Sequence, residues 1–281
     1  MTSVKPIITF FGATGGCAAN TLALALKSGH TCVALARTPS KLRTLMTEGH
    51  GVSDETLNAQ LTIVEGNIRD VAAVKRALVH SNRLVDLIVS GVGSAPKPQK
   101  SLSQPITLHD PTICESAMAS VTEALRALET DLAAPDVPVP KPSMVAISTT
   151  GVSARRRDVP LLFVPFYHWA LAVPHADKAR MEEAVVRAAA PPADGGVLAG
   201  FTIVRPSLLR EGEARGVAAV RAGWELPAGV PDDAAPGSEP APGPAVGYTI
   251  TKADVGNWIF KELVDREKAG KWAGKCVSLT Y

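Results

Sequence analysis

The sequence lacks the features that mark nucleic-acid-binding and membrane proteins. Its 29 Lys and Arg residues nearly balance its 27 Asp and Glu residues, for a formal net charge of +2. Such a balance gives no electrostatic reason to bind nucleic acid or a membrane surface. No apolar run reaches the roughly 18 residues of a spanning helix, and residues 1–6 are too short and polar for a signal peptide. We therefore expect a cytoplasmic protein with neither kind of partner.

Cysteine is scarce, and its spacing does not suggest a metal site. The four cysteines are Cys17, Cys32, Cys114 and Cys276, and none has another at the short interval typical of metal ligands. Reduced thiols in a cytosolic protein are the simplest account of them. We expect no bound metal.

Aromatic residues make up only 5% of the chain, yet four of them lie between positions 163 and 169. This cluster favours a pocket wall for a flat, apolar or aromatic small molecule, although a buried loop that shields the core would look the same. We expect pocket-forming insertions at about 152–174 and 207–250. The second contains Pro227–Pro244, whose Pro, Gly and Ala content is typical of a mobile lid or a disordered loop.

A strand, a glycine turn and a helix follow one another near the N-terminus. The β-forming run from Ile7 ends at Gly12, and a helical pattern runs from about Cys17 to Ser28. Glycines at such a turn let backbone N–H groups approach a diphosphate at a helix N-terminus, where the helix dipole favours negative charge. The turn therefore predicts a nucleotide site. Its residues are Gly12, Ala13, Thr14, Gly15 and Gly16.

The end of the second predicted strand indicates which nucleotide binds. Arg37 stands there with Lys41 close behind it, and no acidic residue occupies the position. In dinucleotide-binding folds an acid at this place binds the ribose 2′-hydroxyl, whereas an arginine suits a 2′-phosphate. We therefore predict NADP(H) rather than NAD(H), with an ordinary solvated basic loop as the alternative.

Strands and helices alternate along the rest of the chain. The expected helices include Lys41–Thr47, Asp70–His80 with Asp70 as its cap, and Thr251–Val264, which begins with a capping-box-like Thr-Lys-Ala-Asp. This pattern predicts an α/β protein: a doubly wound, mostly parallel sheet in a single domain over residues 1–281, with its ligand beyond the carboxyl ends of the strands. Small and polar residues follow four further predicted strands. They predict more of the cofactor site: Asn67 and Ile68, then Gly91, Val92 and Gly93, then Thr149, and finally Pro206 and Ser207.

Several of these segments together resemble one group of families. The glycine turn, Ser-Thr-Thr-Gly at 148–151, Asp-Lys-x-x-x-Glu at 177–182 and Thr-Ile-Val-Arg-Pro-Ser at 202–207 look like the atypical short-chain dehydrogenase/reductases. The resemblance is strongest to NmrA-like and biliverdin-reductase-B-like NAD(P)H-binding proteins. It implies a Rossmann-type domain whose C-terminal portion forms a small substrate-binding part. It does not imply one activity, because relatives include reductases, cofactor-sensing regulators and tailoring enzymes of fungal secondary metabolism.

The sequence departs from this group at the usual catalytic tyrosine. Lys178 matches the lysine of the Tyr-x-x-x-Lys motif, but Pro174 stands where the tyrosine belongs and has no proton to give. The resemblance implies that Lys178 binds the nicotinamide ribose; the alternative is a surface lysine paired with Glu182. Tyr167 and His175 are the nearby candidates for the missing proton donor.

Three functions fit these residues. The first is an NADPH-dependent oxidoreductase that reduces a small to medium apolar carbonyl, imine or conjugated double bond in secondary metabolism. The second is a redox-neutral cyclase or isomerase of natural-product biosynthesis with bound NADP(H), and the missing tyrosine favours it. The third is a non-catalytic NADP(H)-sensing regulator. The sequence leaves the oligomeric state open.

Overall fold

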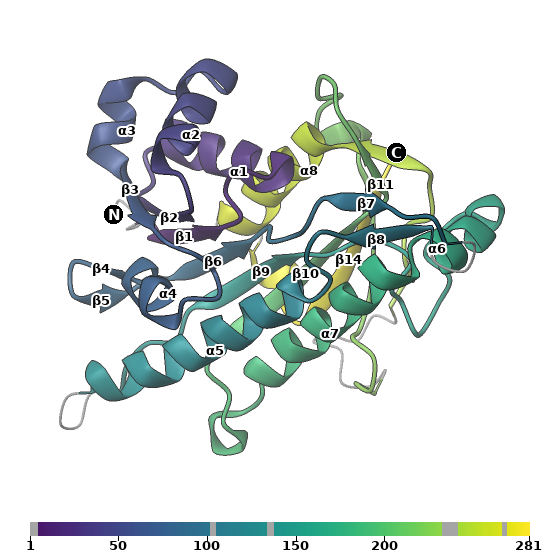
Figure 1. Ribbon diagram of the computed structural model, residues 1–281. Coiled ribbons are helices and arrows are strands. Elements are labelled where there is room, and N and C mark those ends of the chain that lie inside the picture. The colour runs from purple at the N-terminus through teal and green to yellow at the C-terminus, as the bar shows by residue number, and fades with distance from the viewer. Residues whose placement is uncertain (1–4, 102–104, 134–137, 232–240, 266–268) are drawn as a thin grey trace.

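An eight-stranded sheet forms the centre of the protein (Figure 1). In this computed structural model the described residues are 5–101, 105–133, 138–231, 241–265 and 269–281. The strand order is β12-β14-β10-β9-β6-β1-β2-β3, and only the edge strand β12 is antiparallel to its neighbour. The bounds are β1 Ile8–Phe11, β2 Cys32–Ala36, β3 Leu61–Glu65, β6 Leu87–Ser90, β9 Ser143–Ile147, β10 Gly200–Pro206, β12 Arg221–Glu225 and β14 Lys275–Thr280.

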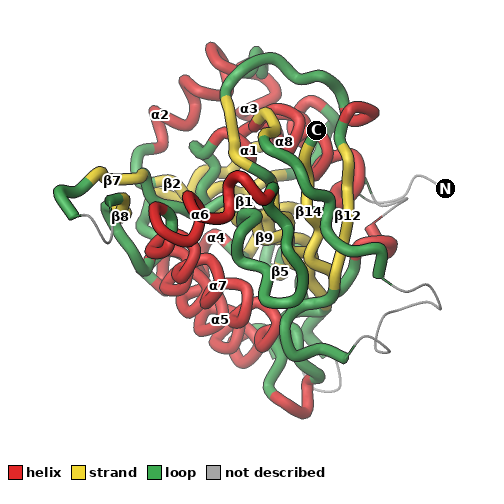
Figure 2. The backbone as a smooth tube through the Cα atoms, turned by 90° about the vertical axis from the view of Figure 1, so that its right-hand side faces the viewer, coloured by secondary structure: helices red, strands yellow, loops and turns green. Residues whose placement is uncertain are grey.

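Helices cover both faces of the sheet (Figure 2). One layer contains α1, α3 and α8, and the opposite layer contains α4, α5 and α7. Since both faces are covered, the fold is the doubly wound α/β sheet that the alternation of elements predicts. The bounds are α1 Gly16–Lys27, α2 Pro39–Thr44, α3 Asp54–Gln60, α4 Val71–Ala77, α5 Ile113–Asp131, α6 Val164–Ala170, α7 Ala172–Ala188 and α8 Lys252–Ile259.

The side chains of the first strand, β1, are buried on both faces of the sheet. Successive side chains of a strand point to opposite faces. Ile8 and Phe10 of β1 belong to the core beneath α1 and α8, whereas Phe11 belongs to the core beneath α4 and α5. All three are at most 1% exposed. A strand buried on both faces therefore reads as a nearly continuous apolar run, interrupted here by Thr9, whose buried hydroxyl donates to the Ala77 carbonyl at 2.6 Å.

The predicted elements are present, with shifted ends. The helix expected at Asp70–His80 ends at Ala77, because Val79–His80 pairs with Arg83–Leu84 in a hairpin. Asp70 caps this helix as predicted, since its carboxylate accepts hydrogen bonds from the first backbone N–H groups. The helix expected from Lys41 starts earlier at Pro39, a residue suited to the first helical turn.

The segments expected to be insertions contain short elements. Residues 152–174 include α6 and the start of α7, which begins at Ala172 because Pro174 is tolerated in a first turn. Residues 207–250 include β12 and most of a two-stranded parallel pair, β11 (Leu208–Arg210) with β13 (Thr249–Thr251). Part of the predicted lid Pro227–Pro244 lies outside the described residues. Among the described residues, no helix has the length and apolar character that crossing a membrane requires.

Candidate functional site

The glycine turn joins β1 to α1 with its backbone packed against the neighbouring strand. Gly12 has φ +70°, and a Cβ atom there would lie 2.7 Å from the backbone of Gly91, which follows β6. The N–H of Gly15 donates to the Gly12 carbonyl at 2.9 Å, and Gly15 is the N-cap of α1 without a side-chain cap. The protein itself therefore requires glycine at position 12, and the uncapped N–H groups of α1 suit an anion.

The basic residues after β2 differ in what they contact. Arg43 donates to Asn58 at 2.7 Å and lies 3.4 Å from Asp54. Arg37 and Lys41 are exposed, and neither forms an ion pair within the described part of the chain. Arg37 stands directly after β2, beside the glycine turn in the sheet order. Of the three, Arg37 and Lys41 are the cations left for an incoming phosphate.

The other predicted cofactor residues lie at or just after the carboxyl ends of parallel strands. The topology therefore brings them to one side of the sheet, which we call the strand edge. The side chain of Asn67 accepts a hydrogen bond from the N–H of Arg69 at 3.1 Å, which organises the turn after β3. Gly91 packs on α1, because a Cβ atom there would meet that of Ala18 at 2.7 Å. Ser207 is buried and bonds to Thr280 at 3.0 Å. Ile68, Val92, Gly93 and Thr149 lie in the turns after β3, β6 and β9, and Pro206 is the last residue of β10.

Lys178 on α7 connects two of these strand ends. Its ammonium group donates to the carbonyl of Val92 at 2.9 Å and to the carbonyl of Ile147 at 2.8 Å. Lys178 is partly buried and does not pair with Glu182, so the alternative of a surface pair is wrong. Glu182 is buried and bonds to Arg205 instead. The lysine is thus fixed between the ends of β6 and β9, in the middle of the sheet.

The two candidate proton donors meet beside Lys178. The rings of Tyr167 and His175 have centroids 5.3 Å apart, and His175 lies one turn before Lys178 on α7. Gly151, at φ +90°, gives them room, because a Cβ atom there would lie 2.5 Å from Tyr167 and 2.7 Å from His175. Burial raises the pKa of Tyr167, so its hydroxyl keeps its proton at neutral pH.

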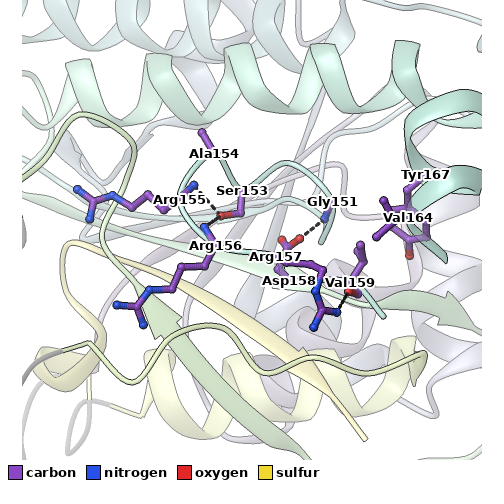
Figure 3. A pocket seen from close by; sticks show the side chains of 10 residues that line it. All are labelled: Gly151, Ser153, Ala154, Arg155, Arg156, Arg157, Asp158, Val159, Val164 and Tyr167. Carbon is purple, nitrogen blue, oxygen red and sulfur yellow. Dashed lines mark hydrogen bonds between the residues drawn. The ribbon is translucent and has the colours of Figure 1, made fainter. Parts of the chain in front are cut away.

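A pocket of about 370 Å³ has Tyr167 of this pair in its wall (Figure 3). It lies where the chain turns from the end of β9 toward α6. A ligand in this pocket would therefore contact Tyr167 and the turn that follows β9. The lining residues are Gly151, Ser153, Ala154, Arg155, Arg156, Arg157, Asp158, Val159, Val164 and Tyr167.

Asp158 is the pocket residue that sequence reasoning missed. Only 3% of it is exposed; one carboxylate oxygen accepts the N–H of Gly151 at 2.9 Å, and the other has no partner among the described residues. Burial raises the pKa of this carboxyl to about 6, although the bond from Gly151 and the charge of Arg205 oppose the shift. The one available signal was an acid between an arginine run and the apolar segment from Val159.

The arginine triplet connects the two insertions. Arg155 donates to the carbonyls of Pro227 and Val230, and Arg156 donates to the carbonyl of Ala241. Arg157 donates to the carbonyl of Val159. Arg156 and Arg157 are exposed, and the guanidinium groups of all three arginines bond to backbone carbonyls.

A buried ion cluster lies behind the pocket. Arg205 of β10 donates twice to Glu182 of α7, at 3.0 and 2.5 Å, and also to Glu225 of β12. Ser153 of the pocket wall bonds to Glu225 at 2.5 Å. Burial by itself would lower the pKa of Arg205, but the bond and charge of Glu182 raise it above its usual value. One arginine thus joins a helix, a central strand and the antiparallel edge strand.

Apolar side chains are exposed near the pocket. Leu161 and Leu162 are 74% and 77% exposed, and Trp169 and Tyr248 are half exposed. Phe163 packs edge-on against Tyr248 with centroids 5.1 Å apart, so the two insertions touch here. The aromatic cluster therefore forms an accessible apolar surface next to the pocket as well as buried packing.

Comparison with known proteins gives two relatives over nearly the whole chain. The reductase pytE from Aspergillus terreus is 41% identical over 100% of this chain and 100% of its own length. The oxidase pynE from Aspergillus niger is 35% identical over 98% of this chain and 99% of its own length. No protein-family model matches the sequence.

Solved structures share the fold at low sequence identity. ChuY, an anaerobilin reductase from Escherichia coli O157:H7, has a TM-score of 0.56 and 17% identity over 97% of this chain and 96% of its own. The oxidoreductase ylbE from Lactococcus lactis has a TM-score of 0.56 and 18% identity over 97% and 90%. At this level of identity the likeness concerns the Rossmann-type fold alone.

Proposed function

The chain belongs to the oxidoreductase family of the Aspergillus proteins pytE and pynE, an atypical short-chain dehydrogenase/reductase family, and we propose that it is an NADPH-dependent reductase of fungal secondary metabolism. Its substrate is a small to medium apolar carbonyl, imine or conjugated double bond. The four cysteines are buried and free, which suits a cytoplasmic enzyme.

The residues at the strand edge fit NADP(H). The glycine turn and the N-terminus of α1 would bind the diphosphate, because Gly12, Gly15 and Gly16 carry no side chain of their own. Arg37 and Lys41 would take the 2′-phosphate, and the turns after β3, β6, β9 and β10 would line the rest of the nucleotide. When bound, the nucleotide supplies two electrons and a hydrogen to the substrate.

One observation carries the proposal: Lys178 is held by two strand-end carbonyls while Tyr167 and His175 meet one turn away. Lys178 would orient the nicotinamide ribose. The substrate would lie in the pocket against Tyr167, with its reacting atom toward the strand edge. Tyr167 or His175 would then give the proton that the reduced product needs, in place of the tyrosine that Pro174 replaces.

Point variants test these roles. General acids contribute about 10²–10⁴-fold to rate, so Tyr167→Phe or His175→Ala should lower turnover by that order with little change in NADPH affinity. Lys178→Met should lower both turnover and affinity. Tyr248→Phe is the matched control for loss of a hydroxyl, because Tyr248 is half exposed and outside the proposed machinery. Unchanged affinity and activity in Lys178→Met would contradict its assigned role.

Pro174 favours a second candidate, a redox-neutral cyclase or isomerase that uses the same pocket. The purified protein would be incubated with NADPH and a panel of carbonyls, imines and conjugated alkenes. Consumption of NADPH supports the reductase, whereas product without consumption supports the redox-neutral enzyme. Binding of NADPH with no product from any substrate would indicate a cofactor-sensing protein.

A further inference from the structure

The helix α8 brings a residue of the C-terminal region to the glycine turn. It packs along α1, and Gly256 makes the contact possible because a Cβ atom there would lie 2.4 Å from that of Asn20 and 2.9 Å from the Cys17 carbonyl. Thr251 caps α8 through its hydroxyl, so the first helical residue is Lys252. The start of α8 is thereby held beside the start of α1.

Lys252 lies against the glycine turn itself. A Cβ atom on Gly16 would lie 2.4 Å from the Cδ of Lys252 and 3.2 Å from its Cβ. The glycine at position 16 therefore leaves the space that the aliphatic part of this lysine fills. Figure 1 shows α8 beside α1, although the two helices lie more than 220 residues apart in the sequence.

The ammonium group of Lys252 is paired, but with an exposed partner. It contacts Glu211, whose side chain is 82% exposed, while that of Lys252 is 32% exposed. Exposed ion pairs of this kind contribute little to stability, so an anion of higher charge can displace the carboxylate at small cost. Because the stem of Lys252 is fixed against Gly16, its ammonium group can reach an anion at the turn without a backbone change.

The positive charges of two lysines reach the first turn of α1. Burial raises the pKa of the Cys17 thiol, and the positive charges of Lys252 and Lys178 oppose that shift. The two belong to helices on opposite faces of the sheet, α8 and α7. The start of α1 thus combines its own dipole with a cation from each layer.

We infer that Lys252 binds the diphosphate of the nucleotide and exchanges Glu211 for it. The inference rests on the proposed NADPH site and adds a ligand from the C-terminal region to it. Lys178 then orients the nicotinamide ribose, Arg37 binds the 2′-phosphate, and Lys252 neutralises the charge between them. The packing of α8 on α1 and nucleotide binding become coupled through this one side chain.

The test is a titration of NADPH against wild type, Lys252→Met and Glu211→Gln by calorimetry. Methionine keeps the apolar stem on Gly16 and removes the charge. Loss of a charge-assisted contact weakens binding by about tenfold or more, so Lys252→Met should bind NADPH at least that much more weakly. Glu211→Gln should bind more tightly, because the competing carboxylate is gone. Lys261→Met, an exposed lysine after α8, should bind as wild type does.

A fragment of the nucleotide shows which phosphate group Lys252 contacts. Adenosine 2′-monophosphate keeps the 2′-phosphate but has neither phosphate of the diphosphate, so Lys252→Met should lower its affinity far less than that of NADPH. Equal NADPH affinity in Lys252→Met and wild type would overturn the inference and leave the proposed function standing. An equal loss for fragment and NADPH would also overturn it. Absence of NADPH binding to wild type would overturn the inference and the proposed function together.

Discussion

The two halves of the strand edge are built by different interactions. At the glycine turn, backbone packs on backbone: Gly12 lies against Gly91 and leaves no room for a side chain. At the pocket, charged side chains join distant segments: Arg205 bonds to Glu182 and Glu225, and Arg155 bonds to the carbonyl of Pro227. Backbone packing therefore fixes the glycine-turn half, which we propose binds the cofactor, and polar side-chain contacts fix the pocket half, which we propose binds the substrate. The three predictions below test this difference, from the largest effect to the smallest.

Removal of the central cation should damage the substrate half most. Arg205→Met leaves Glu182 and Glu225 buried without their partner, which typically costs about 3–5 kcal/mol of unfolding free energy. Denaturant unfolding would measure it, with Arg126→Met on the exposed face of α5 as the control. A loss no larger than that of the control would mean that the cluster does not hold the pocket side together.

The buried acid of the pocket should make stability depend on pH. Because burial raises the pKa of Asp158 to about 6, above its ordinary value of 3.8, ionisation of Asp158 lowers stability as the pH rises through this window. Asp158→Asn cannot ionise, and its amide oxygen can still accept the N–H of Gly151. Its stability relative to wild type should be higher at pH 8 than at pH 4 by about 2–3 kcal/mol, at 1.36 kcal/mol per pKa unit. Thermal unfolding at both pH values measures the difference, and an equal difference at both would contradict the account.

In the cofactor half, the exposed side chain of Arg37 should make the protein bind NADPH more tightly than NADH. Arg37→Ala should weaken NADPH binding by about ten- to a hundredfold, or roughly 1.5–3 kcal/mol, and leave NADH binding nearly unchanged. Arg43→Ala is the matched control, because its guanidinium already bonds to Asn58. If wild type bound both nucleotides with the same affinity, the NADP(H) assignment would be wrong.

The sequence predicts the strands and the helix caps well because their signals are local. Apolar runs locate the strands of the sheet, and the caps Asp70 and Thr251 are confirmed within one turn of their helices. The helix α3 is not predicted, since seven residues are too few for a clear period. The edge strand β12 is missed because it belongs to a segment whose composition suggests a loop.

The substrate half is harder to predict because its partners are far apart in the sequence. Glu182 and Lys178 have the spacing of a helix-surface pair, yet Glu182 turns inward to Arg205, 23 residues away. Asp158 becomes a buried acid only when the chain folds back so that the N–H of Gly151 reaches it. Tyr167 of the aromatic cluster lines the pocket, but the cluster did not indicate the acid.

The most direct test of the account follows the hydrogen that is transferred. The protein would be given NADPH deuterated at nicotinamide C4, on each face in turn, together with any substrate that it converts. The account predicts that one label of the two appears at the reduced carbon of the product, with one NADPH consumed per product. Product that forms without deuterium and without loss of NADPH would contradict the reductase assignment.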